Sequence, residues 1–534
     1  MPEDQQLYFG GDICTVDDAR PTAEAVAVKD GRIVAVGSEA ECKSALAGNY
    51  ESIDLKGKTL MPGFIDTHLH PTGMVTYELY GDFSSVTTIE ELQEKLRQVE
   101  KEIPHPEWVG GLQFEDQKLK SPRLPTRHDL DAAVPDRPAI VVKADGHMVI
   151  ANTKAIEAAG ASAKTQDPEG GKIDREPDGF PAGPFREAAV AVPLGAMPMP
   201  DMNRIRGVAQ KCFQRLASHG ITSAGVVLQT DEEGVFGKQG AFDILLMNVL
   251  LDLILVNLYI SLVAHELAPF EAAKKTRLHN PEPGAGHRIN GLKFWADGTF
   301  GSCTAFMNEP FTDQPDKRGF LILSEDEMYR RMVMAHNAGL QIWVHVIGDA
   351  AFRTMIDLFE RLLKEHPRKD HRHRIEHASI LDEKAIQDMA RLCLVVCTQP
   401  LFIHNEKDWL HKRLGKDRAK WVYPFRAFLD HGVKLAGASD APICSTDVLS
   451  AIQCLVTREG FETHQCITAE QAIRMFTIDA AFAQFEEKFK GSITPGKRAD
   501  LVILSANPAR VTTDKIRDIR VEKTICGGKV IYHV

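Results

Sequence analysis

The sequence has few cysteines, no excess of positive charge and no long uninterrupted apolar run. Ten cysteines lie among 534 residues, and none form a CxxC pair. This spacing indicates reduced thiols in a cytoplasmic protein rather than a disulfide framework. The net charge of −11 gives no general attraction to nucleic-acid phosphates or anionic lipid. We therefore expect neither a nucleic acid nor a membrane as a partner.

A secretory or membrane-spanning segment is not expected either. The first residues, MPEDQQLYFGGDICTVDD, contain neither the basic region nor the apolar core of a secretory signal. The most apolar stretch, 244–264, is interrupted by Asn248, Asp252 and Asn257, whereas a membrane span needs about 18 apolar residues in a row. We predict a buried helix followed by a buried strand here. We also expect the apolar excess of that helix to contribute to an interface in a homo-oligomer.

Both ends of the chain have the pattern of β-strands. Asp30-Gly31 near the start and Gly527-Gly528 near the end each separate two short apolar runs. Such dipeptides are typical of tight hairpin turns. Neither end is long enough to bury a core by itself. We therefore predict one composite β-sandwich, built from residues 1–58 and 488–534.

Between the two ends, short apolar runs alternate with helical patterns. Continuous runs of this length are typical of parallel strands buried on both faces, and eight strand–helix units predict an α/β fold, a (β/α)8 TIM barrel, over 59–487. The first two strands are about 150 residues apart, far more than a crossover needs, so we predict an inserted domain at 75–205. The eight runs are 60–70, 220–227, 257–264, 290–298, 340–349, 372–380, 392–400 and 433–442.

Histidines stand where several of these strands are expected to end. His68 and His70 end the first run, and residues i and i+2 of a strand point to the same side. The carboxyl ends of barrel strands meet at one mouth, where barrel enzymes build their active sites. Imidazole and carboxylate groups gathered there indicate a divalent metal, and Zn²⁺ suits them. The candidate ligands are His68, His70, Lys293, His345, His377 and Asp440.

Several longer motifs follow one another along the chain. They are PGFIDTHLH, DGHMVIANTKAI, GLKFWADGTFGSCTA, VHVIGDAA, RIEHA, GASDAPI and GSITPGKRADLVIL. In this order the motifs resemble the amidohydrolase superfamily, and within it the amidohydrolase-3 (YtcJ-like) family, which includes deformylases of N-substituted formamides.

The resemblance implies a metal site in which this chain's candidate ligands have separate roles. His68, His70 and Asp440 would hold one divalent ion, usually zinc. His345 and His377 would hold a second, and Lys293 would bridge the two if CO₂ carboxylates its amine. The alternative is an unmodified Lys293 that bonds to substrate or to Asp297, and it favours a single metal.

The expected activity is hydrolysis of a C–N bond, of the amide or N-formyl type and not a peptide bond, in a small molecule. A metal lowers the pKa of bound water so that hydroxide forms near neutral pH, and Asp440 would accept the proton and deliver it to the leaving nitrogen. The same site would also suit hydrolysis of an ester, lactone or cyclic imide, or decarboxylation. A third alternative is a non-enzymatic scaffold on this fold. Such a protein would be free to lose metal ligands, whereas all six candidate ligands are present in this sequence.

Four further residues have weaker predicted roles. His147, Trp295 and Cys303 are candidate substrate contacts, and structural roles are the alternative for His147 and Trp295. Asp297 is expected to orient Lys293 from behind. Cys303 stands where the family commonly has arginine, so we expect substrate recognition to differ from that of characterised relatives.

Overall fold

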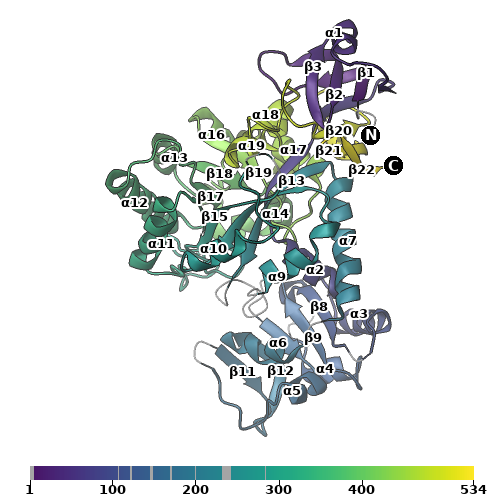
Figure 1. Ribbon diagram of the computed structural model, residues 1–534. Coiled ribbons are helices and arrows are strands. Elements are labelled where there is room, and N and C mark those ends of the chain that lie inside the picture. The colour runs from purple at the N-terminus through teal and green to yellow at the C-terminus, as the bar shows by residue number, and fades with distance from the viewer. Residues whose placement is uncertain are drawn as a thin grey trace. The chain divides into compact units, whose positions relative to one another are not determined.

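The computed structural model describes residues 5–105, 107–120, 123–144, 148–168, 171–198, 200–230, 242–282, 284 and 286–534 (Figure 1). The chain divides into two compact units. The first consists of Met1–Pro71, Phe213–Thr230 and Phe242–Val534, and the second of Thr72–Cys212 and Asp231–Ala241. The segment predicted as an insertion lies within the second unit, whereas both terminal segments belong to the same unit as the barrel.

Eight parallel strands form a barrel in the first unit. They pair in the order β19-β18-β17-β16-β15-β14-β13-β6, and each overlaps one of the eight predicted runs. The predicted set of parallel barrel strands is therefore confirmed. Their bounds are β6 (Phe64–Leu69), β13 (Ile221–Gln229), β14 (Asn257–Val263), β15 (Arg288–Trp295), β16 (Gln341–Val346), β17 (Arg374–His377), β18 (Val395–Thr398) and β19 (Lys434–Gly437).

Hydrogen bonds bridge the two end strands of this sheet, so the barrel is nearly closed. The Thr67 hydroxyl of β6 donates to the carbonyl of Gly437 in β19 at 2.9 Å. Beyond β19, the Asp440 N–H donates to the His68 carbonyl at 2.7 Å, and the His70 N–H donates to the Ala441 carbonyl at 2.8 Å. The segment that follows the last strand therefore lies beside the HxH pair of the first.

Helices follow most of the barrel strands. Their ends carry the expected signals: the Ser324 hydroxyl accepts the Glu327 N–H at the start of α11, and Gly339 follows its end with φ +75°. The described helices that follow β13 in the first unit are α9 (Asp243–Val249), α10 (Ala268–Ala273), α11 (Glu325–Asn337), α12 (Asp349–Glu365), α13 (Glu383–Arg391), α14 (Leu401–Leu414), α15 (Lys416–Ala419), α16 (Phe425–Asp430), α17 (Val448–Thr457), α18 (Ala469–Met475) and α19 (Ile478–Ala483), with short 3₁₀ turns at Leu251–Leu253, Arg458–Gly460, Thr463–Gln465 and Thr513–Asp518.

Strands from both ends of the chain share a second sheet in this unit (Figure 1). The junction is the antiparallel pair β5–β20, in which Pro62 lies opposite Leu501, and residues from both ends fill one core that includes Tyr8, Val26 and Ile525. The two ends therefore build one sheet together, and the sandwich form of this domain stays a prediction. The elements are β1 (Gln5–Cys14), β2 (Thr22–Lys29), β3 (Arg32–Gly37), α1 (Glu39–Ser44), β4 (Glu51–Asp54), β5 (Thr59–Pro62), β20 (Leu501–Leu504), β21 (Val521–Cys526) and β22 (Lys529–His533).

The two predicted hairpin turns are present, and they touch one another. Asp30 and Gly31 join β2 to β3, and Gly527 and Gly528 join β21 to β22, all four with positive φ. A methyl group at Gly31 would lie 2.6 Å from the Gly527 carbonyl oxygen, closer than real side-chain carbons come. Gly31 is therefore needed for its backbone angle and for this close approach.

The second unit contains a mixed six-stranded sheet in the order β11-β12-β10-β9-β8-β7. Neighbouring residues of β9 contribute to different clusters, since Val141 joins Phe83 and Leu96 while Ile140 joins Phe185. Alternate residues of a strand point to opposite faces, so both faces of this sheet are covered. The elements are α2 (Pro71–Leu79), β7 (Gly81–Asp82), α3 (Ile89–Glu102), β8 (Val109–Phe114), the 3₁₀ turn Asp116–Lys118, α4 (Arg127–Asp131), β9 (Ala139–Lys143), β10 (Met148–Ala151), α5 (Thr153–Ala158), β11 (Gly171–Arg175), β12 (Pro181–Glu187), the 3₁₀ turn Ala188–Val190, α6 (Ala191–Ala196) and α7 (Met202–Ser218), which continues into the first unit.

The apolar stretch 244–264 forms a helix and a strand, but the helix is not fully buried. In α9, Met247 is buried while Leu245 is 63% exposed. The reason is that this short helix turns only one face inward, whereas β14 is buried along its whole length. Among the described residues, no helix has both the length and the apolar character needed to cross a membrane.

Candidate metal centre

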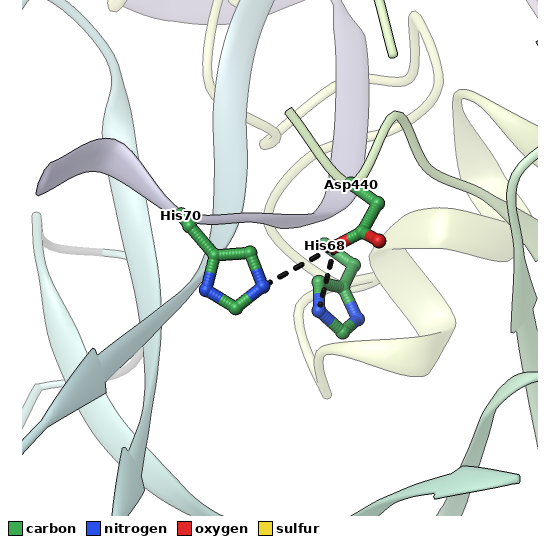
Figure 2. Close-up of side chains that lie close together, drawn as sticks. All are labelled: His68, His70 and Asp440. Carbon is green, nitrogen blue, oxygen red and sulfur yellow. Dashed lines mark ion pairs between the residues drawn. The ribbon is translucent and has the colours of Figure 1, made fainter. Parts of the chain in front are cut away.

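The HxH pair places two imidazoles beside Asp440. His68 lies in β6 and His70 directly follows it, so both rings point to the same side. Asp440 Oδ1 lies 3.4 Å from His68 Nε2 and 3.2 Å from His70 Nε2 (Figure 2). All three side chains are buried, and one possible ligand atom from each lies within 4.8 Å of the other two. Two nitrogens and one carboxylate oxygen are donor types that zinc prefers.

Two more predicted ligands extend this cluster. The ring of His377, from β17, lies 5.5 Å from the ring of His68 and 4.4 Å from that of His345, from β16. His345 Nε2 donates to the Gly298 carbonyl at 3.0 Å, which leaves Nδ1 as the nitrogen able to bind a metal. The structure thus brings four histidine rings from three strands to one end of the barrel.

Lys293 of β15 belongs to the same region. Its side chain is buried, and Nζ has no hydrogen-bond partner among the described residues. Burial lowers the pKa of Lys293 to about 8. Lys293 lies opposite Trp343 in the sheet, and the Trp343 ring is 6.2 Å from the His68 ring. Burial lowers the pKa of His68 to about 4, and the charge of Lys293 adds to this effect. A buried amine without a partner is costly, so it suits a group that is modified or meets a ligand.

The donor set fits a divalent metal. His68 Nε2 is buried without a hydrogen-bond partner among the described residues, and a metal ion is one group that would satisfy it. Burial acts to raise the pKa of Asp440, but the hydrogen bond from His70 and the neighbouring imidazoles of His68 and His377 lower it below the usual range. An ionised carboxylate is therefore ready beside a free imidazole nitrogen, as a metal site requires.

Comparison with known proteins gives the chain its family. A family model described as "Amidohydrolase family" matches residues 51–532. This chain belongs to the amidohydrolase family. The amidohydrolase is 28% identical to the putative amidohydrolase YtcJ of Bacillus subtilis (strain 168), over 98% of this chain and 99% of that protein. It is 27% identical to the N-substituted formamide deformylase of Arthrobacter pascens, over 98% of each.

A solved structure agrees with the fold of this amidohydrolase. An uncharacterized metal-dependent hydrolase from Pyrococcus horikoshii OT3 superposes with a TM-score of 0.78 at 23% identity, covering 96% of this chain and 99% of that one. The resemblance predicted from the motifs is therefore confirmed, and so is the amidohydrolase barrel.

A buried ion pair behind His68 is a feature of this amidohydrolase that sequence reasoning missed. The Glu376 carboxylate lies 2.5 Å from His68 Nδ1 and accepts bonds from Arg374 Nε at 2.7 Å and Nη2 at 2.9 Å. Both charged side chains are fully buried. Burial acts to raise the pKa of Glu376, but the charge of Arg374 and the hydrogen bond from His68 lower it below its usual range. An ionised Glu376 must accept a proton from Nδ1, so His68 keeps its Nε2 lone pair for the metal.

Gln399 has the same function for His377. It follows β18, and its Oε1 lies 2.8 Å from His377 Nδ1. An amide oxygen can only accept, so it fixes the Nδ1–H form of His377 and leaves Nε2 free. Two features of the sequence could have revealed these residues. One is the charged pair Arg374 and Glu376 within a strand that is expected to be buried, and the other is a polar residue directly after β18.

The backbone at two candidate ligands adopts an unusual conformation. His377 has φ +72° and Asp440 has φ +57°, in the left-handed region that non-glycine residues rarely adopt. Such residues cost about 1–3 kcal/mol each and cluster at functional sites. The surrounding fold therefore holds both side chains in place at the expense of local strain.

No hydrogen bond joins Asp297 to Lys293 among the described residues, so the predicted role of Asp297 in orienting Lys293 stays a prediction. The Asp297 carboxylate accepts the N–H groups of Phe306, Ile347 and Gly348 at 2.7–3.0 Å, whereas Lys293 Nζ has no hydrogen-bond partner among the described residues. Asp297 joins the loop after β15 to the loop after β16, and it lies 3.9 Å from His345 Nε2.

Cys303 is buried, and an arginine from elsewhere in the chain contacts it. Arg413, at the end of α14, donates to Cys303 Sγ at 2.8 Å and pairs with Asp313 at 2.8 Å. A guanidinium thus lies beside the position where the family commonly has arginine in sequence. The substrate role proposed for Cys303 stays a prediction.

The other two candidate substrate contacts are Trp295 and His147. Trp295 is partly buried, packs with Tyr259 and Trp343, and has the Lys293 ammonium 5.4 Å from its ring centroid. Its observed contacts are therefore those of a core residue beside Lys293. His147 lies outside the described residues.

Proposed function

We propose that this amidohydrolase is a metal-dependent hydrolase that cleaves an amide or N-formyl C–N bond in a small molecule. The observation that carries the proposal is a buried, ionised Asp440 within 3.4 Å of two imidazole nitrogens, one of which has no other partner among the described residues. The similarity to an N-substituted formamide deformylase supports the type of bond.

The residues divide the chemistry between them. When bound, a divalent ion, for which we propose Zn²⁺, would polarise the substrate carbonyl and acidify water. Asp440 would accept the proton of the attacking water and deliver it to the leaving nitrogen. Its Oδ1 faces the imidazoles of His68 and His70, which leaves Oδ2 for this proton transfer.

The number of metals depends on Lys293. A carboxylated Lys293 would supply two oxygens and allow a second ion at His345 and His377. The lowered pKa of Lys293, about 8, supports this reading because only the neutral amine reacts with CO₂. An unmodified Lys293 would instead place a positive charge in the site and favour one ion.

The test combines metal analysis with a substrate screen. Protein grown with added zinc is analysed for bound metal and then incubated with N-formyl amines, N-acyl amines, and esters and lactones of matched size. We expect stoichiometric metal and release of amine from the formamides or amides. Ester or lactone turnover without amide turnover would contradict the bond type, and absence of metal would contradict the mechanism.

A further inference from the structure

Helix α14 lies against the candidate metal centre from its first turn. It begins at Leu401, directly after β18 and Gln399. The Phe402 ring stacks on the ring of His377, with centroids 5.8 Å apart and planes at 9°. The face of α14 that carries Phe402 therefore starts on a candidate metal ligand.

The next turn of the same face contacts the segment that carries Asp440. Asn405 Nδ2 lies 3.2 Å from the sulfur of Cys444, which follows Asp440 by four positions. Glu406 lies four residues after Phe402, and residues at this spacing are neighbours on one helix face, about 5–6 Å apart. The Glu406 carboxyl group thus stands one helical turn beyond the ring that stacks on His377.

Tyr423 fixes one oxygen of Glu406. Its hydroxyl donates to Glu406 Oε2 at 2.7 Å, and its own N–H donates at 2.7 Å to the carbonyl of Ser379, two residues after His377. The Tyr423 ring is buried and packs edge-on against Phe402, 6.3 Å away. Glu406 is therefore held in position by a residue tied to the same strand end as His377.

The second oxygen of Glu406 has no partner among the described residues. No hydrogen bond or ion pair reaches Oε1, and the next cation on the helix, Lys407, pairs with Glu459 at 2.7 Å. The side chain is half-buried, and burial raises the pKa of Glu406 to about 7. Because Oε1 is not among the fully buried atoms that lack a partner, it stays accessible to a cation or a hydrogen-bond donor of a ligand. Neither the metal ligands nor the packing of α14 requires an acid here.

We propose that Glu406 and Tyr423 form a substrate subsite that binds a cationic nitrogen, an alkylammonium group a few bonds from the scissile amide. Oε1 would accept its N–H groups, while Tyr423 would hold the carboxylate in place through Oε2. The inference rests on the proposed function and deepens it, since it names the substrate as an N-acyl or N-formyl derivative of a diamine.

The test compares matched substrates on the zinc-loaded protein at a pH above 8, where Glu406 is ionised. N-(ω-aminoalkyl)formamides of increasing chain length are paired with N-alkylformamides that carry a methyl group in place of the ammonium. We expect kcat/KM to favour the best cationic member by about tenfold to a hundredfold, the usual effect of one charged hydrogen bond. Glu406→Gln should remove this preference, so that cationic and neutral substrates react with similar kcat/KM.

Two further variants separate charge from structure. Asp408→Asn removes the same charge from an exposed position on α14 and should leave the preference unchanged. Tyr423→Phe keeps the ring but frees Oε2, and should weaken the preference without abolishing it. Equal kcat/KM for both substrate series, or an undiminished preference in folded Glu406→Gln, would overturn the subsite.

Failure of the proposed function would look different. If the wild type hydrolyses neither series, binding of 1,4-diaminobutane is measured by calorimetry against n-pentanol as the neutral probe. Tighter binding of the diamine that Glu406→Gln lowers at least about tenfold supports the subsite without the activity. Equal binding by the wild type and Glu406→Gln refutes it.

Discussion

Replacing Glu376 with glutamine tests whether the buried ion pair controls metal binding at His68. The carboxylate accepts from both His68 Nδ1 and Arg374 Nε. A glutamine amide has one acceptor oxygen and one donor nitrogen, so one of these two neighbours would face an N–H group. If His68 faces it, the imidazole proton moves to Nε2, which removes the lone pair that would bind metal.

Two magnitudes follow from this geometry. Loss of a residue that orients a metal-binding histidine weakens metal affinity about tenfold to a hundredfold, which corresponds to about 1.4–2.7 kcal/mol. Arg374 would also become a fully buried charge without its partner, and removing one member of such a pair costs about 3–5 kcal/mol of folding stability. The variant should therefore lose both stability and metal affinity.

The assay measures the two losses separately. Zinc affinity is obtained by competition with a chromogenic chelator, and stability by urea unfolding of metal-free protein, since bound metal would itself stabilise the fold. Glu486→Gln is the matched control, because Glu486 forms another buried ion pair, with Lys490 at 2.6 Å, and bonds to none of the candidate ligands among the described residues. It should lose stability and keep its zinc affinity. A folded Glu376→Gln variant with wild-type zinc affinity would refute the role assigned to the pair.

Four further outcomes can be checked. Asp440→Asn should lower turnover by about 10²–10⁴-fold, with an unchanged circular dichroism spectrum; near-wild-type turnover would exclude it as the proton carrier. Because burial raises the pKa of Glu406 to about 7, the preference for cationic over neutral formamides should rise between about pH 6 and about pH 8; Tyr423 and Cys444 beside it have raised pKa values and stay protonated there. A preference that is flat with pH would argue against an ionising Glu406. Wild-type protein equilibrated with ¹³C-bicarbonate should show a carbamate carbon by NMR that Lys293→Met lacks. Gly31→Ala should lower the free energy of unfolding by about 1–3 kcal/mol; Gly48→Ala, also at positive φ but with open space around it, should cost less.

The barrel strands were predictable from sequence because their apolar runs reflect burial on both faces. The HxH pair, Asp440 and the two later histidines were predictable for a related reason, since they stand where such runs end. Glu376 and Arg374 were harder, because two charges within a buried strand only make sense once their mutual contact and the contact with His68 are visible.

Contacts between distant segments could not be predicted in this way. Arg413 reaches Cys303 from a helix more than a hundred residues later, and no local pattern marks that meeting. The N–H groups that Asp297 accepts were not predictable, because strand periodicity gives the direction of a side chain but not the backbone N–H groups of the next loop. The partial exposure of α9 was missed because an apolar run shows which residues are apolar and not how many of a short helix's faces are covered.

The pairing of β5 with β20 can form only late in synthesis of the chain. About 440 residues separate the two strands, so at about 5–20 residues per second the ribosome needs roughly 20–90 s to deliver the second after the first. Throughout that time the edge of β5 that β20 will cover lacks its native partner, and exposed strand edges are where chains aggregate. Most of the second unit can fold meanwhile, since it uses one continuous stretch of sequence. The first unit therefore has a long interval in which a chaperone would be most useful, and the contact between the Gly31 and Gly527 turns is among the last to form.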